Sequence, residues 1–200
     1  GFTGDTTVSG GTLQVTGALG ASSSTVTVET GGTLGGTGTI GGDVGVRSGG
    51  TLSPGASPGT LTIDGDLTLS SGSTSTFELN TPSVSGGATN DFVSVGGNLT
   101  LAGTLEATVG SAGYYYLFGY RGLFGGSFDT VTVSGVTGST NTVDTSVSGQ
   151  INLQVVAPGQ TIGFWAGTNT SPNGAIGGGS GTWDGSATNW TSSDGMTNTI

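Results

Sequence analysis

The chain has 200 residues, of which 44 are glycine, and it contains neither cysteine nor histidine. Without these two residue types it has no disulfide framework and lacks the commonest zinc and iron ligands, so we expect neither a metal nor any other cofactor. The formal net charge is −10 with only two basic residues, which excludes nucleic acid as a partner because phosphate binding needs clustered lysine or arginine.

Short runs of alternating polar and apolar residues begin near the N-terminus and are separated by glycine. Val8, Leu13 and Val15 occupy alternating positions, and the same pattern continues through residues 25–46. Threonine and valine favour strands, and glycine favours turns, so the composition predicts an all-β protein. Each run is too short to form a sheet alone and needs neighbouring strands above and below it.

One phrase, Gly-Gly-Thr-Leu, recurs from Gly10, Gly31 and Gly49, at intervals of 21 and 18 residues. Such a period matches one coil of a parallel β-solenoid, and 200 residues then predict an elongated stack of roughly ten coils. The phrase at 66–69 is restated at 98–101, which indicates that equivalent leucines stack in successive coils. We expect the following residues to be rungs of one buried ladder: Leu34, Leu52, Leu61, Leu67 and Leu69.

Residues 110–130 differ from the repeats because they contain all four tyrosines of the chain. In one interpretation Tyr114, Tyr116, Phe118 and Tyr120 alternate inward and fill the core. In the other, an exposed face contacts a receptor or a second copy of the chain, since tyrosine and arginine are favoured at contact hot spots. The candidate contact residues of that face are Tyr115, Leu117, Tyr120 and Arg121.

The repeat pattern ends at Val156, and Ala157-Pro158-Gly159 marks a predicted boundary. We therefore divide the chain into a β-helix repeat region, 1–156, and a glycine- and tryptophan-containing tail, 157–200, which is the start of a further repeat unit. Trp183 and Trp190 in this tail either anchor the next coil or stack on sugars as partner-binding residues.

Paired carboxylates that could act on a polysaccharide are represented by Asp64 and Asp66, two residues apart on one strand. The favoured interpretation makes both of them turn residues around Gly65, because turns favour aspartate. A histidine-dependent serine triad is excluded by the absence of histidine. We expect no enzymatic activity.

Several phrases together resemble the passenger domains of bacterial type V autotransporters, specifically those built from passenger-associated transport repeats. The stretch 6–15, TTVSGGTLQV, matches the core of the repeat. Further matches are found in these segments: 50–55 with 58–61, 90–105, 125–131 and 183–190.

This resemblance implies a right-handed parallel β-helix on the surface of a Gram-negative cell, anchored in the outer membrane through the protein's own C-terminal β-barrel translocator. It also implies a non-enzymatic adhesin that attaches the cell to host cells or matrix protein. The alternatives are a passive stalk or self-associating module that binds a second copy of itself, and a β-helix enzyme acting on polysaccharide.

Overall fold

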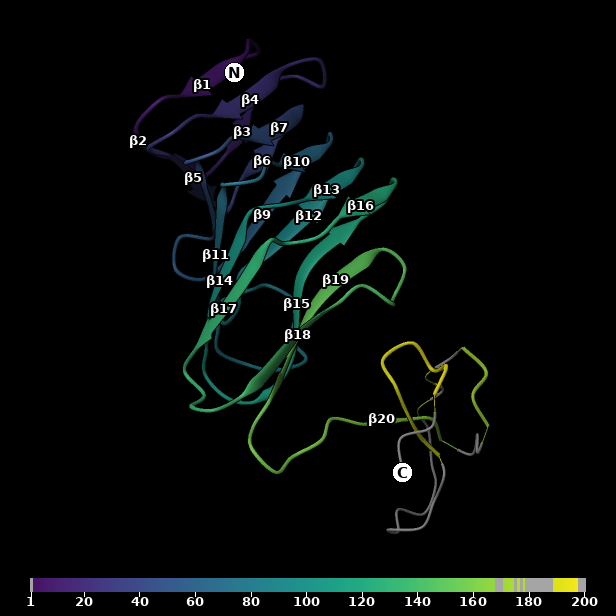
Figure 1. The fold of residues 1–200 in the computed structure, drawn as a ribbon. Coiled ribbons are helices and arrows are strands. Elements are labelled where there is room, and N and C mark those ends of the chain that lie inside the picture. The colour runs from purple at the N-terminus through teal and green to yellow at the C-terminus, as the bar shows by residue number, and fades with distance from the viewer. Residues whose placement is uncertain (1, 168–170, 175, 177, 179–188, 198–200) are drawn as a thin grey trace.

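A computed structural model describes residues 2–167, 171–174, 176, 178 and 189–197. The chain winds as a parallel β-helix, each coil contributing one strand to each of three sheets. Figure 1 shows the strands of each sheet following one another from the N-terminal to the C-terminal end. Among the described residues, no helix has the length and apolar character needed to cross a membrane.

The strands of the three sheets alternate along the chain. Sheet A contains β1 (Thr6–Val8), β4 (Thr25–Val28), β7 (Asp43–Val46), β10 (Leu67–Leu69), β13 (Leu99–Leu101) and β16 (Phe124–Gly126). Sheet B contains β2 (Gly11–Val15), β5 (Gly32–Gly36), β8 (Thr51–Pro54), β11 (Thr74–Leu79), β14 (Thr104–Val109) and β17 (Thr130–Ser134). Sheet C contains β3 (Ala18–Leu19), β6 (Thr39–Ile40), β9 (Thr60–Ile63), β12 (Phe92–Val95), β15 (Gly113–Tyr120), β19 (Gln150–Val156) and β18 (Thr140–Asp144).

The repeated phrase stacks on itself in sheet B. Thr12 pairs with Thr33 and Thr33 with Thr51, which reproduces the intervals seen in the sequence. The same outward column continues through Thr74, Thr104 and Thr130. Stacked threonines suit this position because β-branched side chains pack well between neighbouring strands.

The number of coils is smaller than the roughly ten that the sequence predicts. Sheets A and B each contain six strands, one per coil. The prediction assumed a constant period, but Leu67 pairs with Leu99, 32 residues later, because long loops enter the later coils. With about 4.8 Å between strands, six rungs make a stack about 25 Å long.

The apolar residues inside the coils form separate columns rather than the single ladder expected. All five predicted leucines are buried. Leu34 and Leu52 pair in sheet B, Leu61 faces the core from sheet C, and Leu67 and Leu69 belong to sheet A. The difference arises because one coil folds through three sheets, so leucines close in sequence enter the core from different sides.

Acidic and amide side chains form a ladder at the corner between sheets C and A. Asp43 Oδ1 accepts the backbone N–H of Asp66 at 2.8 Å, and Asp66 Oδ1 accepts that of Asn98 at 2.7 Å. Asn98 Oδ1 then accepts the N–H of Leu123 at 2.7 Å. Asp5 does the same for Thr25 in the first coils, at 2.8 Å. We call this set the corner ladder; each member satisfies a backbone donor of the following coil.

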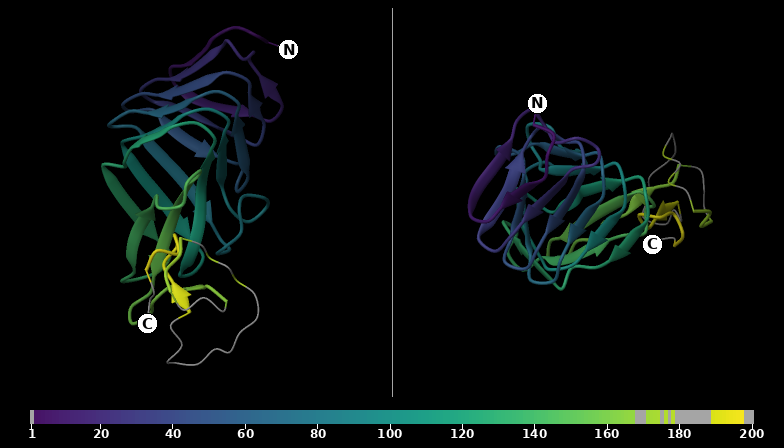
Figure 2. Two further views of the ribbon diagram at one scale, coloured as in Figure 1. Left: turned by 90° about the vertical axis from the view of Figure 1, so that its right-hand side faces the viewer. Right: turned by 90° about the horizontal axis from the view of Figure 1, so that it is seen from above.

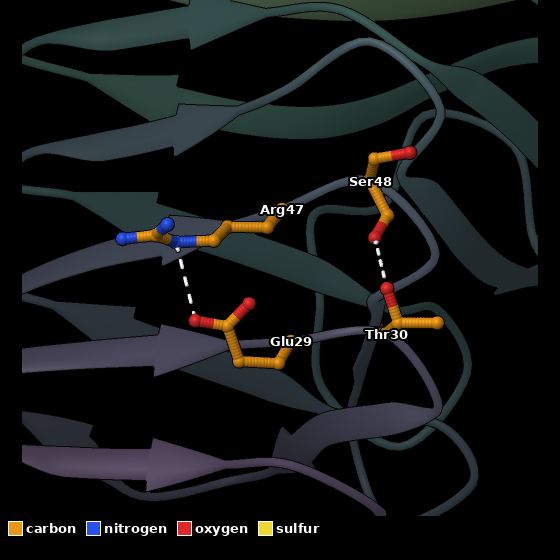
Figure 3. A network of polar contacts seen from close by, with 4 residues as sticks. All are labelled: Glu29, Thr30, Arg47 and Ser48. Atoms are coloured by element: carbon orange, nitrogen blue, oxygen red, sulfur yellow. Dashed lines mark hydrogen bonds and ion pairs between the residues drawn. The ribbon is translucent and has the colours of Figure 1, made fainter.

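The opposite corner, between sheets A and B, is held by surface contacts between successive coils (Figure 3). Arg47 Nε lies 3.4 Å from Glu29 Oε1. Beside them the hydroxyl of Thr30 donates to the backbone oxygen of Ser48 at 2.8 Å. The ion pair is largely exposed, so its contribution to stability is small.

The C-terminal end of the stack is irregular. Sheets A and B stop at β16 and β17, whereas sheet C continues with β19 and β18, which pair antiparallel to β15 and to each other. Beyond them, β20 (Phe164–Trp165) and β21 (Trp190–Thr191) form a separate two-stranded sheet, which Figure 2 shows at this end of the molecule. The division of the chain at Val156 into two units stays a prediction.

Candidate functional site

A polar groove runs along the outer face of sheet B and encloses about 440 Å³. Its floor crosses several coils through the paired outward positions Gln14, Gly35 and Ser53. Gly35 leaves a gap in this column, because a side chain there would collide with the backbone oxygen of Ser53. The later coils contribute the hydroxyl and carboxylate groups of Thr76 and Glu106.

One wall of this groove is the turn that follows β8, which contains Gly55 and Ser57. Gly55 has a φ of 86° and Ser57 a φ of 78°, so both lie in the left-handed region. Ser57 is a non-glycine residue there, a conformation that persists only when the surroundings fix it. The fixing contact is made by its hydroxyl, which donates to Glu78 Oε2 at 2.9 Å.

Asp91 holds the same wall from inside. It is 3% exposed, and its two carboxylate oxygens accept the backbone N–H groups of Gly59 and Glu78 at 2.9 and 2.8 Å. Burial raises the pKa of Asp91 to about 6, although the two N–H donors lower it, and the charge of Glu78 adds to the increase. The carboxylate therefore serves to position the turn and the adjoining strand.

The chemistry available in this groove is hydrogen bonding by hydroxyl, amide and carboxylate groups. Both oxygens of Asp91 are used by the backbone, which leaves Glu78 and Glu106 to face solvent. In the described part of the chain, no group of three or more acidic residues is placed to hold a metal ion. Asp66, a predicted partner of Asp64 in a carboxylate pair, uses both oxygens on Asn98, as the turn interpretation expects.

The aromatic segment forms β15, and two of its predicted contact residues are wrong. Tyr115 and Leu117 are both 0% exposed and belong to the core. The reason is a β-bulge between Tyr116 and Phe118, formed where β15 pairs with β19. It turns Leu117 and Phe118 inward in succession, and it leaves Tyr116 on the outer face. The alternative of strict alternation with Tyr114 and Tyr116 inward is wrong for the same reason.

The sequence was compared with known proteins. No protein-family model matches the chain. Over 207 aligned residues the chain is 42% identical to a protein of Brucella suis biovar 1 (strain 1330) named adhesin BmaC autotransporter. The chain belongs to the autotransporter passengers. The alignment covers 95% of this passenger segment and 6% of the length of that relative.

The other predicted contact residues of the passenger segment lie apart from one another. Tyr120 is half-buried, with its ring centroid 5.5 Å from that of Phe124, and Arg121 is exposed at the following corner. Trp190 is half-buried in β21, 5.2 Å from the ring of Trp165. Trp183 lies outside the described residues. A contact role for Tyr120, Arg121 and the two tail tryptophans stays a prediction.

Sequence reasoning missed one aromatic residue on the surface of the passenger segment. Phe92 begins β12 and pairs in register with Thr60, an outward position, so its ring is directed to the outer face of sheet C. The signal was present in the strand itself, because in Phe-Val-Ser-Val the buried residues are Val93 and Val95. Phe92 and Tyr116 line a second hollow, whose use is considered below.

Proposed function

We propose that this passenger segment takes part in attaching a bacterial cell to host cells or extracellular matrix protein, as a non-enzymatic part of a surface adhesin. The observation that carries the proposal is the 42% identity to a protein named an adhesin, which extends over 95% of the chain. In this proposal the segment is displayed on the cell surface, and the full-length protein is anchored in the outer membrane by its own translocator.

The sheet B groove supports such a role because it is a fixed surface with many hydrogen-bonding groups. Ser57 and Asp91 hold its wall without help from a partner. A surface that is already ordered loses little entropy on binding, which favours affinity. The negative charge of the chain disfavours anionic partners and leaves neutral or basic ones.

Binding of the purified segment to cultured epithelial cells and to immobilised matrix proteins tests the proposal. We expect saturable binding that Thr33→Arg, in the groove, weakens at least about tenfold by blocking it. Thr27→Arg is the matched control, since Thr27 is an equally half-buried threonine on the outer face of sheet A. Binding that is absent, or that never saturates, would contradict the proposal.

Self-association is a second candidate, favoured by the open C-terminal edges of sheets A and B. Leu123 beside β16 is 80% exposed, and Val131 in β17 is 37% exposed. Unpaired strand edges with apolar neighbours readily accept a second chain. Sedimentation velocity over a hundredfold concentration range would detect it, and Leu123→Ser is expected to reduce it; a monomer at every concentration argues against this candidate.

A further inference from the structure

A hollow of about 450 Å³ on the outer face of sheet C combines aromatic rings with neutral polar groups. Phe92 and Tyr116 supply the rings, and the side chains of Ser83, Ser85 and Gln150 supply hydroxyl and amide groups. Gly119 and Gly149 complete the lining. We call this hollow the Phe92–Tyr116 pocket. Its volume falls within the 300–1,000 Å³ typical of sites for small ligands.

The two rings are held on the surface by the backbone around them. Phe92 is outward because it continues the column of Thr60. The position next to it in β15 is Gly119, where an added Cβ would lie 3.0 Å from Phe92 Cζ, so the absence of a side chain leaves room for the ring. Tyr116 packs edge-to-face against Tyr114, with ring centroids 5.9 Å apart. Both rings remain half-exposed.

The polar rim is ordered in advance by a buried amide. Asn90 is 0% exposed, and its Nδ2 donates to the backbone oxygens of Thr81 and Val84, both at 2.6 Å. Its Oδ1 accepts the N–H of Thr81 at 2.9 Å. The N–H of Ser83 donates to the oxygen of Tyr114 at 2.7 Å, and Ser83 has a φ of 61°. A loop fixed in this way, with a strained residue at the rim, is typical of a ligand clamp.

The lining selects the chemical class of the ligand. None of the residues that line the pocket carries a charge. Half-exposed aromatic rings bind apolar faces, and hydroxyl and amide groups bind hydroxyls, so the combination suits a ligand with one apolar face and a polar edge. Pyranose sugars have this character. Polyanionic sugars are disfavoured by the net charge of −10.

We propose that the Phe92–Tyr116 pocket binds an uncharged saccharide, with pyranose rings stacked on Phe92 and Tyr116 and hydroxyls bonded to Ser83, Ser85 and Gln150. The inference rests on the proposed attachment function and gives it a ligand class. The pocket is on a different sheet from the groove, so each can be altered without the other.

Calorimetric titration of the intact chain with triacetylchitotriose and maltotriose tests the proposal, with trigalacturonate as the anionic comparison. We expect one neutral trisaccharide to bind and trigalacturonate not to bind. Phe92→Thr is expected to weaken binding about tenfold. This variant restores the residue type found at Thr60 in the same column, and thermal unfolding would verify that it folds. Ser94→Ala, farther along the same strand, is expected to bind as the wild type does.

The outcomes separate the pocket from the attachment function. If neither neutral sugar binds, or if Phe92→Thr binds as tightly as the wild type, the pocket proposal is wrong even when the chain attaches to cells. If a neutral sugar binds and Phe92→Thr loses it, the pocket stands even when attachment to cells is not observed. Equal binding of trigalacturonate would contradict the charge argument and with it the assigned ligand class.

Discussion

Replacing Asp91 with asparagine is expected to remove a pH dependence from the folding stability of this passenger segment. Burial raises the pKa of Asp91 to about 6 in the folded chain, against an ordinary value of 3.8 that applies when the chain is unfolded. Between these two values the folded chain binds more protons than the unfolded chain. Its free energy of unfolding therefore decreases as the pH rises from about 4 through about 6, and is level above that.

The magnitude follows from the size of the shift. Two pKa units at 1.36 kcal/mol each give at most about 3 kcal/mol lost between pH 4 and pH 7. Asparagine at this position stays neutral, so the slope disappears. It also cannot accept both the N–H of Gly59 and that of Glu78, and the unpaired donor lowers the stability at every pH by about 1–3 kcal/mol.

Urea unfolding followed by circular dichroism, at several pH values from 4 to 7.5, measures both effects. Asp64→Asn is the control, because Asp64 is exposed on a corner, and it should keep the wild-type slope. Hydrogen bonds from Asn98 lower the pKa of Asp66, so the stability linked to that group is lost only below pH 4, outside the window. A slope that is unchanged in Asp91→Asn would refute the assignment of the titration to Asp91.

Three further changes test the architecture by urea unfolding and proteolysis. Leu67→Ala, in the buried column of sheet A, should lower the free energy of unfolding by about 2–5 kcal/mol, whereas Thr68→Ala, exposed on the same strand, should change it by less than about 0.5 kcal/mol. Gly42→Ala should cost more than about 2 kcal/mol, because its Cβ would collide with a backbone oxygen of the preceding coil; Gly45→Ala, with no atom within 4 Å, should be neutral or stabilising. Asn90→Ala should cost about 2–3 kcal/mol and make the loop before β12 sensitive to protease, and resistance to cleavage would contradict its role there.

The fold was predictable where the chain repeats itself without interruption. The Gly-Thr-Leu phrases at 11, 32 and 50 pair in register, because their period is set by strand and turn lengths that leave no freedom. The same triad at Gly59 does not join them: Thr60 lies in sheet C. A sequence phrase describes a strand and its turn, and it does not say which of three equivalent sheets the strand enters.

The candidate site was less predictable because its features depend on contacts distant in sequence. The inward direction of Leu117 results from a bulge that forms only when β15 meets β19, more than thirty residues later. The role of Asp91 depends on Gly59, and no local pattern connects the two. In contrast, the outward position of Phe92 follows from the alternation within its own strand.

The corner ladder gives the stack a direction. In each printed step the side chain belongs to the coil nearer the N-terminus, and the backbone N–H belongs to the coil after it. A coil removed from the C-terminal side leaves behind only a carboxylate or amide oxygen at the surface, which water can hydrate. A coil removed from the N-terminal side leaves a backbone donor without its acceptor. Each coil is thus a template for its successor, and the helix is suited to grow coil by coil from its N-terminal end.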